Sequence, residues 1–169
     1  MRQMDTGFTL IEMLVTVSII AVLLSIAVPS YDSAIASTRM SNEINELQAS
    51  LNFARSEAVK RGLRIYICPP TVPAGTNCST APPLAWTSGW VVLDSTAVSP
   101  ILRISPALTH GDTLISTSNT GASPIFTPAG YTFFTDTITL HDSKNTQVLY
   151  RCIVFNAGSW SVQKGATCP

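Results

Sequence analysis

A long uncharged segment near the amino terminus constrains this chain more than any other feature. Residues 13–28 carry no charge and consist of Met, Leu, Val, Ile, Ala and small hydroxyl residues. With Phe8 to Glu12 included, the segment is long enough to cross a hydrocarbon layer of about 30 Å as a helix. One carboxylate, Glu12, lies inside the segment near its start, where a membrane makes a charge costly. A buried carboxylate needs a partner, so Glu12 is the first candidate for a specific role.

The residues before this segment are polar and end at a glycine. A secretory signal would place its small-residue cleavage site after the apolar run, and no clear site of that kind follows here. Cleavage after Gly7 would instead retain the apolar helix and expose a new amine on Phe8. Because residues 8–38 contain no Lys or Arg, that amine is the one cation within the segment that could neutralise Glu12. Many such helices packed side by side would bring Glu12 of one subunit to the Phe8 amine of a neighbour.

The run G-F-T-L-I-E at residues 7–12 resembles the class III signal of type IV prepilins and type II secretion pseudopilins. The resemblance implies cleavage by a prepilin peptidase between Gly7 and Phe8, N-methylation of Phe8, and an assembly salt bridge from Glu12. Residues 1–7 would then be a leader peptide and residues 8–29 the transmembrane and assembly helix. The alternative is a plain anchored protein in which Glu12 sits protonated and idle near the membrane interface.

The rest of the chain has the composition of an exported, strand-rich domain. Formal net charge is zero and charged residues are only 12% of the chain, which gives no electrostatic argument for nucleic acid or an acidic surface. The four cysteines allow three pairings, and an oxidising compartment favours disulfides. Spacing suggests that Cys68–Cys78 closes one loop and that Cys152–Cys168 ties down the carboxyl terminus. A zinc site is disfavoured, because close pairs such as C-x2-C are absent.

Periodicity predicts a helix that continues past Pro29 and then a series of short strands. Apolar residues recur every three or four positions from Ile44 to Ala58, and Gly62 is a plausible stop after Lys60 and Arg61. Pro29 should kink or loosen the helix. Residues 30–62 form its amphipathic half, and residues 63–169 form an antiparallel β head domain. Strands are expected at 64–68, 90–93, 101–104, 113–116, 137–140, 148–155 and 160–163, with a hairpin around 142–145 and a bend at 124–130. The fold class is α+β, one long helix packed on an antiparallel sheet.

Three motifs in this half extend the resemblance nearly end to end. The segment A-R-S-E-A at 54–58, the block W-T-S-G-W-V-V at 86–92 and the bend F-T-P-A-G at 126–130 resemble segments of the GspH/FimT group of minor pilins. The cysteines are most similar to those of FimU-type minor pilins of type IV pili. The resemblance implies a minor pilin, anchored in the inner membrane with its head in the periplasm. It would then enter a pilus with other minor pilins and the major pilin, to prime or cap assembly.

Enzymatic chemistry finds no support in the sequence. The run His141-Asp142-Ser143 contains the residue types of a catalytic triad, but consecutive positions at a turn cannot form the relay in space. The aspartates show no calcium-loop spacing, and no glycine-rich phosphate loop is present. We therefore expect no catalytic site, no metal and no cofactor. Trp86 and Trp90 flank a glycine at a strand start, where aromatic residues are more often core than an exposed patch.

Two other functions remain open from the sequence. A type II secretion pseudopilin would share the leader, the helix and the peptidase. A DNA-uptake pilin would need a basic carboxyl-terminal segment such as the G-R-x-R of some FimT-type relatives, where this chain has Gly158-Ser159-Trp160-Ser161. Serines replace both arginines, which removes phosphate-binding charge. Arg151 and Lys164 remain nearby and Trp160 could stack on a base, so these three residues are the weak candidates for DNA contacts.

Overall fold

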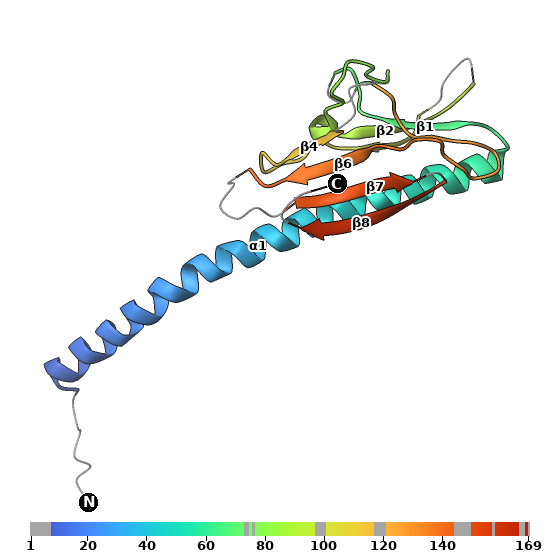
Figure 1. The fold of residues 1–169 in the computed structure, drawn as a ribbon. Helices are drawn as coiled ribbons and strands as arrows, with labels where there is room; N and C mark the ends of the chain where they lie inside the picture. Colours follow the sequence, from blue (N-terminus) through green and yellow to red (C-terminus); the bar gives the residue numbers. More distant parts are fainter. Residues whose placement is uncertain are drawn as a thin grey trace, which may run out of the picture. The chain divides into compact units, whose positions relative to one another are not determined.

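The computed structural model describes residues 8–72, 75, 77–96, 101–116, 121–143, 150–156, 158–165 and 168. The chain forms two compact units, Met1–Ser37 and Thr38–Pro169. One α-helix and one short 3-10 helix are found in the described part, together with eight strands (Figure 1). In chain order they are α1 (Leu10–Arg61), β1 (Ile65–Cys68), η1 (Trp86–Ser88), β2 (Trp90–Asp94), β3 (Ile101–Ser105), β4 (Thr113–Ser116), β5 (Ile125–Phe126), β6 (Thr137–His141), β7 (Tyr150–Asn156) and β8 (Ser159–Gly165).

Helix α1 begins and ends where local chemistry favours it. At its start the backbone N–H of Glu12 donates to the Thr9 hydroxyl at 3.3 Å, which satisfies one of the free amides of the first turn. At its end the Gly62 N–H donates to the Ala58 carbonyl at 3.1 Å. The helix continues through Pro29, so the proline does not end it, and a kink at that position stays a prediction.

The strands divide into two antiparallel sheets rather than the single sheet that the sequence analysis described. One sheet has the order β3-β2-β1-β5 and the other has the order β4-β6-β7-β8. Each predicted strand is present with ends shifted by no more than two residues, except that Val148 and Leu149 lie outside the described part. The bend predicted at 124–130 contains the short strand β5, which pairs with β1. The first two residues of the predicted turn at 142–145 are described, and the other two lie outside the description.

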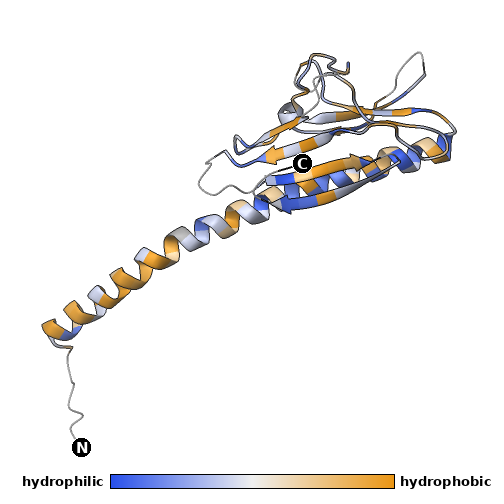
Figure 2. Cartoon of the chain, viewed as in Figure 1, coloured by the Kyte–Doolittle hydropathy of each residue, from blue (hydrophilic) through white to orange (hydrophobic). Residues whose placement is uncertain are grey.

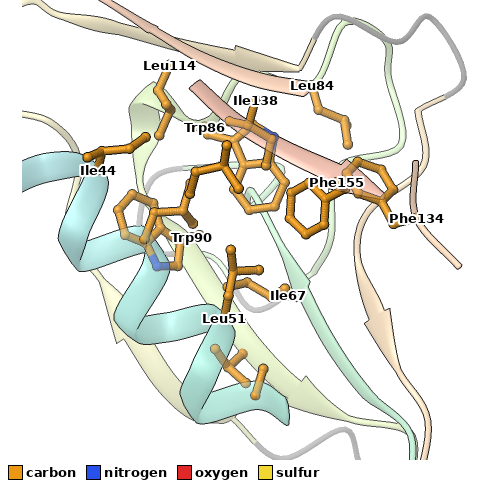
Figure 3. Close-up of a cluster of buried hydrophobic side chains, with 14 of the residues drawn as sticks. Ile44, Leu51, Ile67, Leu84, Trp86, Trp90, Leu114, Phe134, Ile138 and Phe155 are labelled. Atoms are coloured by element: carbon orange, nitrogen blue, oxygen red, sulfur yellow. The ribbon is translucent and has the colours of Figure 1, made fainter. Parts of the chain in front are cut away.

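The core of the second unit lies between α1 and both sheets. The α1 stripe from Met40 to Ala58 is buried and packs against side chains of β1, β2, β4, β6 and β7, which explains its period of three to four residues. Figure 3 shows Ile44 and Leu51 of the helix among the side chains of the strands. The predicted helix stripe and its cover by strands are therefore confirmed for this unit.

The W-T-S-G-W block is a structural motif of this core. Trp86 and Trp90 are 0% and 1% exposed, so both belong to the interior rather than to a surface patch. Gly89 between them has φ of 91°, and a Cβ there would lie 2.3 Å from the Ser105 carbonyl oxygen. Only glycine allows β2 to enter the sheet this close to the end of β3. The block therefore places two tryptophans in the core.

Candidate functional site

The helical part of the first unit exposes a long run of large apolar side chains. The large apolar side chains from Phe8 to Val28 are 48–83% exposed. Figure 2 shows apolar residues on most of this part of α1, interrupted by small polar ones. By length and composition α1 could cross a membrane, although a secretory signal passes the same test. Its most apolar window is not buried within the protein, as a core helix would be. Such a helix requires lipid or other helices as its surroundings.

The residues of the proposed assembly pair lie at the start of this face. Phe8 is 75% exposed and precedes the first helical residue, Leu10. Glu12 is the acidic residue of the first turn and is exposed among apolar and small hydroxyl side chains. Gly7, the predicted cleavage position, lies outside the described residues. Glu12 and Phe8, the residue that would carry the new amine, are thus close together in the sequence, at the start of α1.

A second polar site, which the sequence analysis missed, lies inside the second unit. Arg39 of α1 donates from Nε and Nη2 to the two carboxylate oxygens of Asp112, at 2.7 and 2.9 Å. Its Nη2 also contacts Asp142 at 2.6 Å, and the Ser143 amide donates to Asp112 at 2.9 Å. Asp112 is fully buried. Arg39 therefore joins the helix to the turn before β4 and to the end of β6.

Glu43, one turn along α1, adds a third carboxyl group beside Asp112 and Asp142. We call these four residues, Arg39, Glu43, Asp112 and Asp142, the Arg39 cluster. Burial, together with the negative charge of Asp112, raises the pKa of Glu43 to about 7. Burial also opposes the charge on Asp112, but hydrogen bonds from the Ser143 amide and from Arg39 outweigh it and lower the pKa of Asp112. Arg39 has its pKa raised by its hydrogen bond to Asp112. Arg39 thus pairs with two aspartates, and Glu43 beside them has a raised pKa whereas Asp112 has a lowered one.

The Arg39 cluster should make stability of the second unit depend on pH. The raised folded-state pKa of Glu43 means that its contribution is complete below about 4.5 and is lost as pH rises to about 7. The free energy of unfolding of wild type should therefore fall over this interval, and Glu43→Gln should flatten the decline. Urea unfolding of the full-length protein in detergent at several pH values measures it. Glu46→Gln is the control for loss of a helix carboxylate, and an unchanged slope in Glu43→Gln would contradict the prediction.

Both disulfides join the cysteines that the spacing suggested. Cys68 in β1 is bonded to Cys78 with Cα atoms 5.4 Å apart, and Cys152 in β7 is bonded to Cys168 with Cα atoms 5.9 Å apart. The first bond holds the loop after β1 against the sheet. In this loop Cys78 also forms an isolated antiparallel β-bridge with Pro70. The second holds the segment after β8 beside β7. No group of three or more His, Cys, Asp or Glu side chains in the described ranges could hold a metal ion.

The candidate DNA contacts lie together on β7 and β8, on the face toward α1. Arg151 and Lys164 are cross-strand partners, and Arg151 donates to the Ser41 hydroxyl of α1 at 2.9 Å. The Trp160 ring packs edge-on against Phe126, with centroids 5.6 Å apart. The Arg55 guanidinium also lies 5.7 Å from the Trp160 ring centre. These contacts occupy two of the three candidates within the protein, and DNA stacking on Trp160 would have to displace them.

Two profiles of known protein families match this sequence. The sequence profile of the family described as "Type II transport protein GspH" matches residues 43–159. The chain belongs to the GspH family. A second profile, the "Prokaryotic N-terminal methylation motif", matches residues 2–28, which include Gly7, Phe8 and Glu12. The family match begins within the amphipathic half of α1 and runs to the first residue of β8, and the motif covers the apolar half.

Individual relatives agree with the family and its fold. Two proteins from Pseudomonas aeruginosa, each called "Fimbrial protein", are 39% identical to this chain over 59 residues. The match covers 35% of this chain and only 38% of each relative. The crystal structure of the type IV minor pilin FimU from P. aeruginosa is similar with a TM-score of 0.57 and 21% identity, over 75% of this chain and 90% of that one. This GspH-family protein therefore has the α+β pilin fold.

Proposed function

We propose that this protein is a minor type IV pilin, made as a prepilin and anchored in the inner membrane with its head in the periplasm. Prepilin peptidase cuts after Gly7, and the new terminus at Phe8 is N-methylated. The mature chain then enters the pilus with other minor pilins and the major pilin, where it primes or caps assembly. The function is structural and needs no catalytic residue.

The observation that carries this proposal is the exposed apolar segment 8–28 with a single carboxylate in its first turn. Among the described residues, those from Phe8 to Thr38 include no Lys or Arg to neutralise Glu12. The mature amine of Phe8 on a neighbouring subunit supplies that charge, and the apolar side chains of both helices cover each other. An ion pair in apolar surroundings sets the register between subunits, because shifting it leaves an unpaired charge in a membrane-like environment.

Removal of this carboxylate should reduce assembly while leaving the head folded. We expect Glu12→Ala to be processed and to reach the membrane at wild-type levels, but to be depleted at least about tenfold from sheared pili, since an energetic loss of about 1.4 kcal/mol gives that factor. Immunoblots of membrane and pilus fractions measure both quantities. Asp32→Ala, which removes an exposed carboxylate farther along α1, is the matched control. Wild-type incorporation of Glu12→Ala would contradict the Glu12–Phe8 pair.

The second candidate is a minor pseudopilin of type II secretion, favoured by the description of the family whose profile matches. A deletion strain separates the two functions when surface pili with twitching, secreted enzymes and DNA uptake are scored in parallel. Lost pili restored by wild type, but not by Glu12→Ala, would support the minor pilin. Normal pili with failed secretion would support the pseudopilin. Normal pili with failed DNA uptake would support a DNA-uptake pilin, with Arg151, Trp160 and Lys164 as the candidate contacts.

A further inference from the structure

A hollow of about 440 Å³ lies on the face of β1 that is turned away from the core. Alternate residues of β1 face opposite sides of the sheet. Ile65 and Ile67 belong to the core, whereas Tyr66 packs with a separate cluster on the outer side. Tyr66 is paired across the sheet with Leu93 of β2 and with Ile125 of β5. These three neighbouring side chains line the hollow as an aromatic and aliphatic floor.

Two segments of backbone form the walls of this hollow. One wall is the loop 77–80, which the Cys68–Cys78 disulfide holds against the sheet. The other is the segment 121–123 that leads into β5. Gly121 has φ of 66°, and a Cβ on it would lie 2.2 Å from the carbonyl oxygen of Thr80. The two walls therefore touch at a point that only glycine permits, so the hollow is built into the fold.

The rim carries polar side chains that form no hydrogen bond with other side chains in the described part of the chain. No side-chain hydrogen bond to another described residue is formed by Tyr66, Asn77, Ser79 or Thr80, all of which line the hollow. The hydroxyl oxygen of Ser123 is buried and likewise lacks a partner in the described chain. That oxygen has almost no accessible surface, so the polar side chains that a ligand in the hollow can reach are those of Tyr66, Asn77, Ser79 and Thr80. The volume lies within the range of small-molecule sites.

Charge in the hollow restricts the ligand. The described residues of its lining include one acidic residue, Asp94, and no Lys, Arg or His, which disfavours phosphates, nucleotides and other anions. Asp94 is 4% exposed, and its Oδ1 accepts hydrogen bonds from the amide and the hydroxyl of Thr96. This carboxylate is held by Thr96, and its cross-strand partner is the core residue Ile65 rather than Tyr66, so it is not offered to a ligand on the Tyr66 face. The remaining rim groups are neutral hydroxyls and an amide.

We propose that this hollow, the Tyr66 site, binds a neutral saccharide. An apolar floor of one tyrosine and two aliphatic side chains fits the C–H face of a sugar ring. A rim of neutral hydroxyls and an amide fits the sugar hydroxyls around its edge. The site lies on the opposite side of the β3-β2-β1-β5 sheet from the core and uses no residue of the Glu12 pair. It would give the protein a glycan-binding role that is independent of its assembly.

Ligand-observed NMR with the full-length protein tests the proposal. The protein is held in a zwitterionic detergent without a sugar headgroup, and saturation transfer is recorded to the methyl glycosides of glucose, galactose, mannose and N-acetylglucosamine. Putrescine and glucose 6-phosphate serve as cationic and anionic probes. We expect transfer to at least one glycoside, no binding of the phosphate, and no competition by putrescine. Transfer to none of the four glycosides, or displacement by putrescine, would overturn the proposal.

Two variants locate the binding and one controls for it. Tyr66→Ala removes the aromatic floor, and Thr80→Val removes a rim hydroxyl without changing its shape. Each should weaken glycoside binding about tenfold or more in calorimetric titration. Tyr131→Ala, an exposed aromatic position that does not line the hollow, should bind as wild type does. Near-ultraviolet circular dichroism verifies that each variant is folded. Wild-type affinity in both Tyr66→Ala and Thr80→Val would place the glycoside elsewhere and overturn the Tyr66 site.

Discussion

Replacing Arg39 with methionine should lower the free energy of unfolding by about 3–5 kcal/mol, the usual cost of breaking a buried ion pair from one side. The change leaves Asp112 fully buried with the Ser143 amide and the Glu43 carboxyl group as its partners, and leaves Asp142 at 4% exposure without its guanidinium. Methionine keeps the apolar stem, so most of the loss is electrostatic. Urea unfolding of the full-length protein in detergent, followed by the fluorescence of the buried Trp86 and Trp90, measures it.

A double variant separates charge from packing at this site. Arg39→Met combined with Asp112→Asn should be less destabilised than Arg39→Met alone, since the buried negative charge is gone. Lys60→Met is the control for loss of a cation on the same helix. Its side chain is 77% exposed and its partner Glu57 retains Arg61, so we expect little change. A loss below about 1 kcal/mol in Arg39→Met would mean that the Arg39 cluster does not hold α1 to the strands.

Truncating Leu51 to alanine should lower the free energy of unfolding by about 2–5 kcal/mol. Leu51 is fully buried in the middle of the α1 stripe, within a cluster that also contains Ile67 of β1 and Trp90 of β2 (Figure 3). Truncation removes apolar contacts and leaves a cavity, because helix and sheets on either side are too closely packed to collapse around it. The same denaturation measurement reports the change.

Val59→Ala is the matched control on the same helix. Val59 is 56% exposed, and alanine is the better helix former, so the free energy of unfolding should change by no more than about 0.5 kcal/mol. If Leu51→Ala and Val59→Ala were equally mild, the buried stripe of α1 would not be the main support of the head. Both variants leave Glu12 and the Tyr66 site untouched, so membrane insertion and glycoside binding should be preserved.

The helix and the strands could be predicted because their signals are local. Apolar residues three or four apart from Ile44 to Ala58 fit one face of a helix, and alternating residues in 65–68 or 113–116 fit a strand. The Arg39 cluster could not be predicted in this way. Arg39 is 73 residues from Asp112 and 103 from Asp142, and no spacing rule connects them. The available signal was weak: Arg39 is the first basic residue of α1, and Asp112 and Asp142 lie at the ends of strands.

The division of strands between two sheets was also beyond the sequence. Hydropathy indicates which residues of a strand are buried, but not which strand becomes its neighbour, because pairing depends on contacts between distant segments. Candidate DNA contacts show the same limit. From the sequence, Arg151 and Trp160 were candidates for contacts with DNA at the surface. In the structure, β7 and β8 turn them toward α1, where Ser41 contacts Arg151 and Arg55 contacts Trp160.

The amino-acid sequence alone determined the character of the first unit: an apolar segment from residue 8 onward, one carboxylate at Glu12, and a motif that places the protein among the pilins. These follow from the order of residues along the chain, because hydropathy and helical period are properties of neighbours. Only the tertiary structure decided that Arg39 binds two distant aspartates and that Tyr66, Thr80 and Ser123 meet around one hollow. Such sites arise where packed elements bring separate segments together, and packing depends on the whole fold.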